Sequence, residues 1–153
     1  MNSSALNKGL LVIGRILIGI IFVESGFGKI MNFDGTAGYM AAKGMPMVSL
    51  LLLGAIAVEI GGGLSLLLGV KPRWGALALF LFMIPTTLIF HKFWGLEAAE
   101  SAMQQIQFFK NLSVMGGLLV VFSSGSQQPG LDNLLCGCCC SSAKVPPADT
   151  AAK

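Results

Sequence analysis

The hydrophobic positions of the chain gather into four long runs and do not alternate with polar ones. The runs cover about residues 10–30, 48–70, 74–90 and 108–122. A helix needs about 20 residues, within a range of about 17 to 25, to cross a bilayer core. The first two runs have this length and the third is near the lower limit. The fourth is short unless its helix begins earlier, near Glu97. Barrel strands would be shorter and would alternate in polarity, so the pattern predicts four transmembrane helices.

The segments between the runs are rich in glycine, proline and polar residues. Residues 31–47 form a predicted loop with room for a short interfacial helix, and Lys71–Arg73 allow only a tight antiparallel turn. The link from 91 to 107 is the most polar part of the chain. We therefore predict an all-α, antiparallel, integral membrane four-helix bundle in residues 1–124, followed by a flexible, Cys-rich C-terminal tail in 125–153.

The composition supports a membrane protein. Hydrophobic residues make up 54% of the 153 residues and charged residues 11%, and the mean hydropathy is +0.78. Soluble domains have about 25% charged residues, and a domain this small could not bury so much apolar surface. The lipid bilayer is thus the expected partner. The net charge of +3 is scattered along the chain, which argues against nucleic acid.

Lysine and arginine in the short flanks predict the orientation, because cytoplasmic loops carry an excess of them. Six fall on the side of the two termini and four on the other side. The larger set is Lys8, Arg15, Lys71, Arg73, Lys144 and Lys153, and the smaller is Lys29, Lys43, Lys92 and Lys110. The count predicts that both termini are cytoplasmic.

Seven polar side chains fall inside or at the ends of the predicted helices, where an ionisable group costs about 2.5–3.5 kcal/mol. They are the candidate ligand-binding or polar intramembrane residues Arg15, Glu24, Lys29, Glu59, His91, Lys110 and Asn111. A rise of 1.5 Å per residue puts Glu59 near mid-membrane, within reach of Arg15, so we expect an Arg15–Glu59 pair. The other five lie toward the opposite side and are expected to converge on one layer.

The first helix carries polar groups on two faces. At 100° per residue, Arg15 and Lys29 lie within about 40° of each other, and Glu24 points to roughly the opposite face. This suits a helix packed on several sides or at the interface of a homo-oligomer.

Several glycines are placed for close packing of helices. Gly62 and Gly63 follow Glu59 by three and four residues and share its face. Small residues there let a neighbouring backbone approach the carboxylate. We expect the same role for Gly26 and Gly117.

Simpler interpretations stand beside the functional ones. Lys29, Lys92 and Lys110 could snorkel to the interface, and His91 could be a structural histidine at a helix end. The two carboxylates, Glu24 and Glu59, are too short to snorkel far and are the strongest functional candidates.

No motif of a soluble enzyme occurs, and no metal site is predicted. A single histidine cannot supply the two ligands of a bis-histidine membrane cytochrome without help from a methionine or a partner subunit. The catalytic residues are therefore unknown, and the chain on its own is more simply a non-enzyme.

Several blocks of the sequence resemble the DoxX family of small bacterial membrane proteins. The blocks are GRILIGIIFVESGFGK, YMAAKGMP, AVEIGGGLSLLLG, FHKFW and FFKNLSVMGG, and together they span about residues 9–123. The recurring family positions fall on Arg15, Gly26, Lys29, Gly44, Pro46, Glu59, Gly62, Gly63, His91, Phe93, Lys110, Asn111 and Gly117. Glu24 is not among them.

The resemblance implies a four-helix protein of the bacterial inner membrane with a redox or oxidative-stress context. The family name comes from a subunit of a thiosulfate:quinone oxidoreductase, and some relatives are associated with superoxide dismutase and a sulfurtransferase. We therefore expect an accessory subunit of a redox-related membrane complex, with a quinone or lipid-like molecule as the candidate ligand. In that case His91 and Lys110 would donate to quinone carbonyls and Glu59 would relay protons. The alternatives are a scaffold for soluble oxidoreductases and, less simply, a small-solute transporter.

Four cysteines, Cys136, Cys138, Cys139 and Cys140, cluster beyond the family resemblance. Their spacing is not that of a zinc ribbon. Three interpretations stay open: a thiolate metal or redox site, S-acylation next to the membrane, or an inert accumulation in the tail.

Overall fold

The structure is a computed structural model in which residues 3–124 are described. They form five helices and no strand: α1 (Ser3–Met31), α2 (Phe33–Ala42), α3 (Val48–Leu68), α4 (Pro72–Phe90) and α5 (Ala98–Ser124). All except α2 are long and apolar enough to cross a membrane. The predicted all-α membrane bundle is confirmed, whereas the orientation of its termini stays a prediction.

Two helices differ in length from the hydrophobic runs. Helix α1 already begins at Ser3 and α5 at Ala98, well before residue 108. The first turns of α5, AAESAMQQIQ, are polar but consist mainly of good helix formers. The fourth helix therefore begins close to Glu97, as the sequence analysis allowed for a span of sufficient length. The predicted 31–47 loop contains the ten-residue helix α2.

The tight turn between α3 and α4 is built by local backbone chemistry. Gly69 ends α3 in the left-handed region with φ 69°, where glycine has no steric penalty. The Ser65 hydroxyl donates to the carbonyl oxygen of Val70 at 2.7 Å. Pro72 then opens α4, where its missing N–H costs no hydrogen bond. The two helices are thus forced to run antiparallel.

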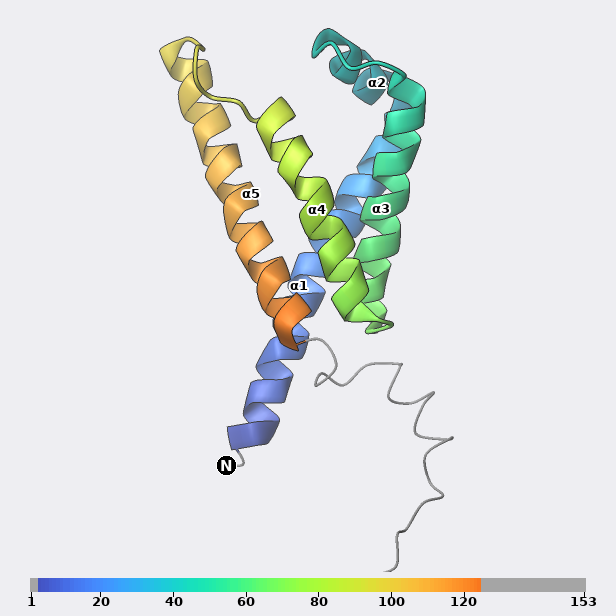
Figure 1. Ribbon diagram of the computed structural model, residues 1–153, viewed down its shortest axis with the longest axis vertical. Helices are drawn as coiled ribbons and strands as arrows, with labels where there is room; N and C mark the ends of the chain where they lie inside the picture. Colours follow the sequence, from blue (N-terminus) through green and yellow to red (C-terminus); the bar gives the residue numbers. More distant parts are fainter. Residues whose placement is uncertain (1–2, 125–153) are drawn as a thin grey trace, which may run out of the picture.

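The long helices are arranged as two pairs, α1 with α3 and α4 with α5, which are joined through α3 and α4. Figure 1 shows the pairs close together at the α3–α4 turn and diverging toward the other end, which carries α2 and the α4–α5 link. We call these the turn end and the α2 end. The first turns of α1 extend beyond the turn end (Figure 1).

The core lies where the pairs meet. It consists of Phe22 from α1, Leu66 from α3, Ala76, Leu79 and Met83 from α4, and Leu118 and Val121 from α5. Glycines allow this contact: a methyl group at Gly117 would lie 2.8 Å from Ile18 Cδ1, and one at Gly62 would lie 2.6 Å from Leu79 Cγ. The outward faces of all four long helices expose large apolar side chains, as expected for lipid contact.

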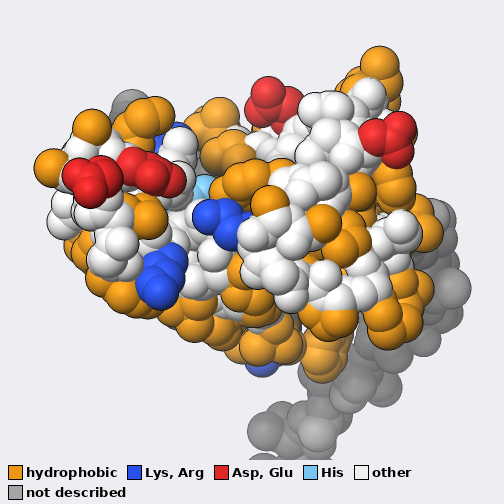
Figure 2. Space-filling view, turned by 90° about the horizontal axis from the view of Figure 1, so that it is seen from above, with side chains coloured by type: hydrophobic (Ala, Val, Ile, Leu, Met, Phe, Trp, Pro, Cys, Tyr) orange, Lys and Arg blue, Asp and Glu red, His pale blue; other side chains and the backbone are white. Residues whose placement is uncertain are grey.

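The α2 end carries both acidic and basic side chains. In Figure 2, which looks onto this end, acidic side chains lie toward its edges and basic ones nearer the middle. Tyr39 of α2 stacks on Phe90 at the end of α4, with ring centroids 5.7 Å apart. An aromatic contact therefore ties α2 to the α4–α5 pair.

Candidate functional site

An ion pair joins α1 to α3 inside the bundle. The Lys29 ammonium donates to both oxygens of Glu59, at 2.9 Å to Oε1 and 2.8 Å to Oε2. It also donates to the Ser25 hydroxyl at 2.8 Å, and that hydroxyl donates to Glu59 Oε1 at 3.4 Å. Ser25 and Lys29 are one helical turn apart and therefore share a face of α1. We call these three residues the Glu59 cluster.

Glycines position this cluster by letting α1 and α3 touch. A methyl group at Gly63 would lie 3.0 Å from the carbonyl oxygen of Gly19 and 2.8 Å from Val23 Cγ2. One at Gly26 would lie 2.6 Å from Ile60 Cγ1 and 3.3 Å from Glu59 Cβ. No larger side chain fits without moving a helix. The short interhelical distance brings the lysine over the carboxylate.

Burial makes the two charges depend on each other. The Glu59 side chain is 5% exposed and the Lys29 side chain 25%. A buried charge without a partner costs several kcal/mol, and the lysine and the serine together satisfy the carboxylate. The cluster therefore fixes the relative register of α1 and α3.

The predicted Arg15–Glu59 pair is wrong, since Lys29 and Ser25 are the groups that bind Glu59. Ser25 marks the level of Glu59 on α1, ten residues from Arg15, which is about 15 Å along the helix. The depth estimate placed the start of the first hydrophobic run level with the end of the second, but α1 projects beyond the turn end. Arg15 is buried, with 3% exposure, one turn beyond Gly19, close to the level of the α3–α4 turn.

A second polar group joins α4 to α5. Asn111 Nδ2 donates to the hydroxyl of the buried Thr87 at 3.1 Å. His91 Nδ1 lies 3.1 Å from Gln104 Oε1. Because an amide oxygen only accepts, Nδ1 is the protonated nitrogen of this contact. Within residues 3–124, no hydrogen bond or ion pair joins this group to the Glu59 cluster. Of the five residues expected to converge on one layer, Lys29 thus belongs to the Glu59 cluster, whereas His91 and Asn111 belong to the α4–α5 group.

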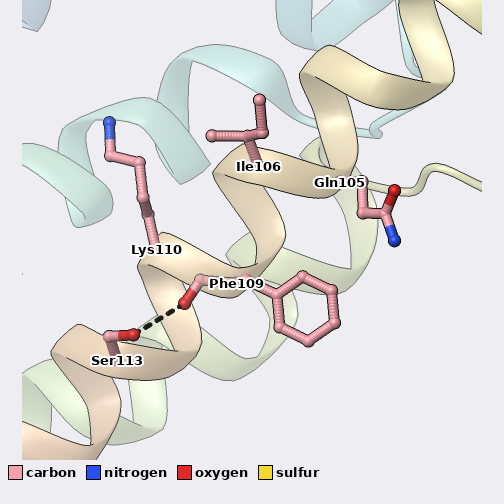
Figure 3. Close-up of a pocket in the computed structure, with 5 residues that line it drawn as sticks. All are labelled: Gln105, Ile106, Phe109, Lys110 and Ser113. Carbon is pink, nitrogen blue, oxygen red and sulfur yellow. Dashed lines mark hydrogen bonds between the residues drawn. The ribbon is translucent and has the colours of Figure 1, made fainter.

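Lys110 belongs to neither group. It is exposed on α5 and lines a shallow, open pocket of about 430 Å³ together with Gln105, Ile106, Phe109 and Ser113. All five lining residues come from α5 (Figure 3), and the Ser113 hydroxyl donates to the Phe109 carbonyl at 3.0 Å. In this view the Lys110 side chain extends from the helix on the other side from the Phe109 ring.

Lys110 and the α1 residues of the Glu59 cluster lie on the helix faces by which α5 and α1 meet. Ile18 of α1 packs on Gly117 of α5, and Lys110 lies seven residues before Gly117, on the same face of its helix. On α1, Ser25 and Lys29 follow Ile18 by seven and eleven residues and also keep its face. Toward the α2 end the two helices diverge (Figure 1), with Lys110 on α5 and Ser25 and Lys29 on α1.

Glu24 lies on a different surface. It is exposed, on the face of α1 opposite the buried Arg15, and no residue within 3–124 forms a hydrogen bond or an ion pair with it. The cysteines Cys136, Cys138, Cys139 and Cys140 lie outside the described residues.

Three residues of these contacts were absent from the sequence-based candidates: Ser25, Thr87 and Gln104. All are neutral, and our search considered mainly ionisable groups. A spacing of four residues from a candidate would have found two of them, because Ser25 precedes Lys29, and Thr87 precedes His91, by one turn.

Comparison with known proteins now identifies the family. The DoxX family profile matches residues 10–92. The chain belongs to the DoxX family. The inner membrane protein YqjF of Escherichia coli is 38% identical over 124 residues, which cover 81% of this chain and 90% of that protein. The inner membrane protein YphA of the same organism is 34% identical over 123 residues, covering 80% and 88%.

The similarity extends more weakly to a eukaryotic protein. The ER-derived vesicles protein ERV29 of Saccharomyces cerevisiae is 23% identical over 146 residues, covering 85% of this chain and 47% of that protein. No solved structure matches. With four membrane-spanning helices and inner-membrane relatives over most of its length, this DoxX chain is a multi-pass inner-membrane protein.

Proposed function

We propose that this DoxX protein holds a quinone, or another lipid-like molecule with a polar head, between α1 and α5, and acts as an accessory subunit of a redox-related membrane complex. The observation that supports the ligand is that Lys110 and the Glu59 cluster lie on facing sides of α5 and α1, which diverge toward the α2 end (Figure 1). We call the proposed binding region between them the α1–α5 opening. The apolar tail of such a molecule suits the exposed apolar surface of the helices, and its head would meet the polar side chains near the α2 end.

The charges favour a head group that accepts hydrogen bonds. Lys29 and Lys110 bring two ammonium groups to the opening and Glu59 brings one carboxylate, which Lys29 already neutralises. The Lys110 ammonium has three N–H donors and no acceptor. A quinone carbonyl or an anionic head group is therefore the chemistry that matches it.

His91 enters this proposal in a different role from the one expected. With Nδ1–H donating to Gln104, a neutral imidazole leaves Nε2 as an acceptor, which suits a quinol hydroxyl better than a quinone carbonyl. Gln104 and Lys110 are also six residues apart, so they point about 120° away from each other around α5. Lys110, not His91, is the residue we assign to the head group in the opening.

The test is native mass spectrometry and lipid extraction of the protein purified in mild detergent. We expect a quinone or a polar lipid to copurify in near-stoichiometric amount, and Lys110→Gln to reduce it about five-fold or more. Lys92→Gln is the matched control, because Lys92 is also an exposed lysine near the α2 end but lies over the Trp94 ring. Repeated absence of any bound molecule, or equal loss in both variants, would contradict the ligand. If oxidoreductase subunits copurify with the protein but no small molecule does, the result would instead indicate that the protein is a scaffold for these enzymes.

A further inference from the structure

The charged side chains are divided unequally between the two ends of the bundle. The acidic residues of the described chain lie in the middle of the spans or at the α2 end: Glu24, Asp34, Glu59, Glu97 and Glu100. The turn end carries basic residues, with Lys71 in the α3–α4 turn and Arg73 in the first turn of α4. Within residues 3–124, no carboxylate side chain therefore balances the positive charge of the turn end.

An aromatic ring supports the Arg73 side chain. The guanidinium carbon Cζ lies 4.7 Å from the centroid of the Phe122 ring, near the end of α5. Phe122 is half-buried and packs against the hydrophobic core, so the ring is held firmly. A cation over the face of an aromatic ring is attracted to it. The contact therefore keeps the guanidinium at the surface where α4 meets α5.

The ring contact leaves the hydrogen-bond donors of Arg73 available. A guanidinium is always charged and has five N–H donors in one plane. Arg73 is exposed, and no residue within 3–124 forms a hydrogen bond or an ion pair with its side chain. The planar fork of an arginine matches two oxygens of a phosphate. A phosphate group is thus the chemistry that suits this position.

The depth of Arg73 in the membrane indicates a lipid as the source of the phosphate. Trp74, the next residue, is 66% exposed, and tryptophan at the end of a span prefers the headgroup layer. Both residues are in the first turn of α4, a 19-residue span. The guanidinium therefore lies at the level of the lipid phosphates.

We propose that the turn end binds the head group of an anionic phospholipid. Arg73 contacts the phosphate, Phe122 positions Arg73, and Lys71 adds a second positive charge. A zwitterionic head group carries an ammonium, which finds no carboxylate among the described residues of this end, so a head group with a net negative charge is preferred. The site is at the opposite end of the bundle from the α1–α5 opening and does not rest on the proposed function.

The first test is native mass spectrometry of the full chain in mild detergent, with added phosphatidylglycerol or phosphatidylethanolamine of identical acyl chains. We expect phosphatidylglycerol to bind about five-fold more tightly or better, and Arg73→Gln to remove about five-fold, the usual contribution of one basic residue near anionic lipid. The matched control is Lys43→Gln, because Lys43 also lies over an aromatic ring, 5.5 Å from the Tyr39 centroid, but at the α2 end. Equal binding of the two lipids, or equal loss in both variants, would overturn the proposal.

Three further measurements separate a built phosphate site from general surface charge. Arg73→Lys keeps the charge but loses the planar fork, so it should bind phosphatidylglycerol more weakly than the wild type and more tightly than Arg73→Gln. Phe122→Leu should weaken binding about two- to five-fold, the range for an exposed cation–π contact. Excess inorganic phosphate should leave the lipid bound.

Wild-type affinity in Arg73→Lys and Phe122→Leu would show that only the charge matters and would overturn the assigned contacts. Displacement of the lipid by inorganic phosphate would indicate a site for a free anion instead. Because Arg73 is exposed, Arg73→Gln should unfold at the same temperature as the wild type, which confirms that the loss of lipid is not a loss of fold.

Discussion

At the scale of single residues, the Glu59 cluster shows how a membrane helix carries a charged side chain at a small cost in free energy. Lys29 and Ser25 come from one face of α1 and together satisfy the one carboxylate of α3. The lysine keeps a quarter of its side chain exposed while the glutamate is almost fully enclosed. If the ion pair is broken, the Glu59 carboxylate therefore stays buried without a charged partner.

This asymmetry gives a testable difference. Lys29→Met should lower the free energy of unfolding by about 3–5 kcal/mol, the usual cost of breaking a buried pair, because it leaves the Glu59 charge enclosed. Glu59→Leu should cost less, because the ammonium can turn toward the opening. The double variant should be more stable than Lys29→Met alone. Thermal or denaturant unfolding in detergent measures all three, and equal effects of the two single variants would refute the asymmetry.

The residues also show where sequence reasoning succeeds and where it stops. Lys29 and Glu59 were found because an ionisable group in an apolar run is conspicuous. Their pairing was missed because helix depth depends on where each helix begins, and α1 begins at Ser3 and projects beyond its neighbours. Which residues pair between two helices depends on how far one helix is shifted along the other. The hydropathy of the sequence does not give this shift.

At the scale of helices, glycine contacts decide which helices touch. Gly19, Gly26 and Gly63 bring α1 against α3, and Gly62 leaves room for the Leu79 side chain of α4. Gly61 differs from them, because no heavy atom lies within 4 Å of a methyl group added there. Neighbouring glycines in the run Gly61–Gly63 therefore have different roles. The helix itself was predictable from its apolar run, but the role of each glycine was not, since it depends on the facing helix.

A pair of substitutions separates these roles. Gly63→Ala should destabilise the bundle by about 1–3 kcal/mol, because its methyl group meets backbone atoms of α1 that cannot move without shifting the helix. Gly61→Ala is the control on the same helix. It should be neutral or stabilising by up to about 1 kcal/mol, since alanine is the better helix former. Unfolding curves of the two variants measured in one detergent provide the comparison, and similar curves would argue against close α1–α3 packing.

At the scale of the whole molecule, the two helix pairs meet at the turn end and separate toward the α2 end (Figure 1). The hydrophobic runs predicted four membrane helices because the bilayer requires every span to be a continuous apolar helix. They did not predict the divergence, which follows from where Ile18 meets Gly117. The placement of Lys110 and of the Glu59 cluster on facing helices thus appears only in three dimensions.

The orientation of the molecule gives a further prediction. Lys71 lies in the α3–α4 turn and Arg73 in the first turn of α4, so the turn end and both termini should face the cytoplasm. A fluorescent protein fused after Lys153 should fluoresce, and alkaline phosphatase at the same position should be inactive. Alkaline phosphatase inserted between Leu96 and Glu97, in the link at the α2 end, should be active. The opposite pattern would reverse the orientation and place the α2 end in the cytoplasm.

The Lys29–Glu59 pair also constrains how the chain is made. The two residues are 30 positions apart, so at about 5–20 residues per second the ribosome adds the glutamate about 1.5–6 s after the lysine. During that interval the nascent α1 holds an ammonium group that has no carboxylate to bind. We expect the lysine to stay at the membrane surface or within the insertion machinery until α3 follows. The first helix would then reach its final depth late in biosynthesis, when the second span arrives.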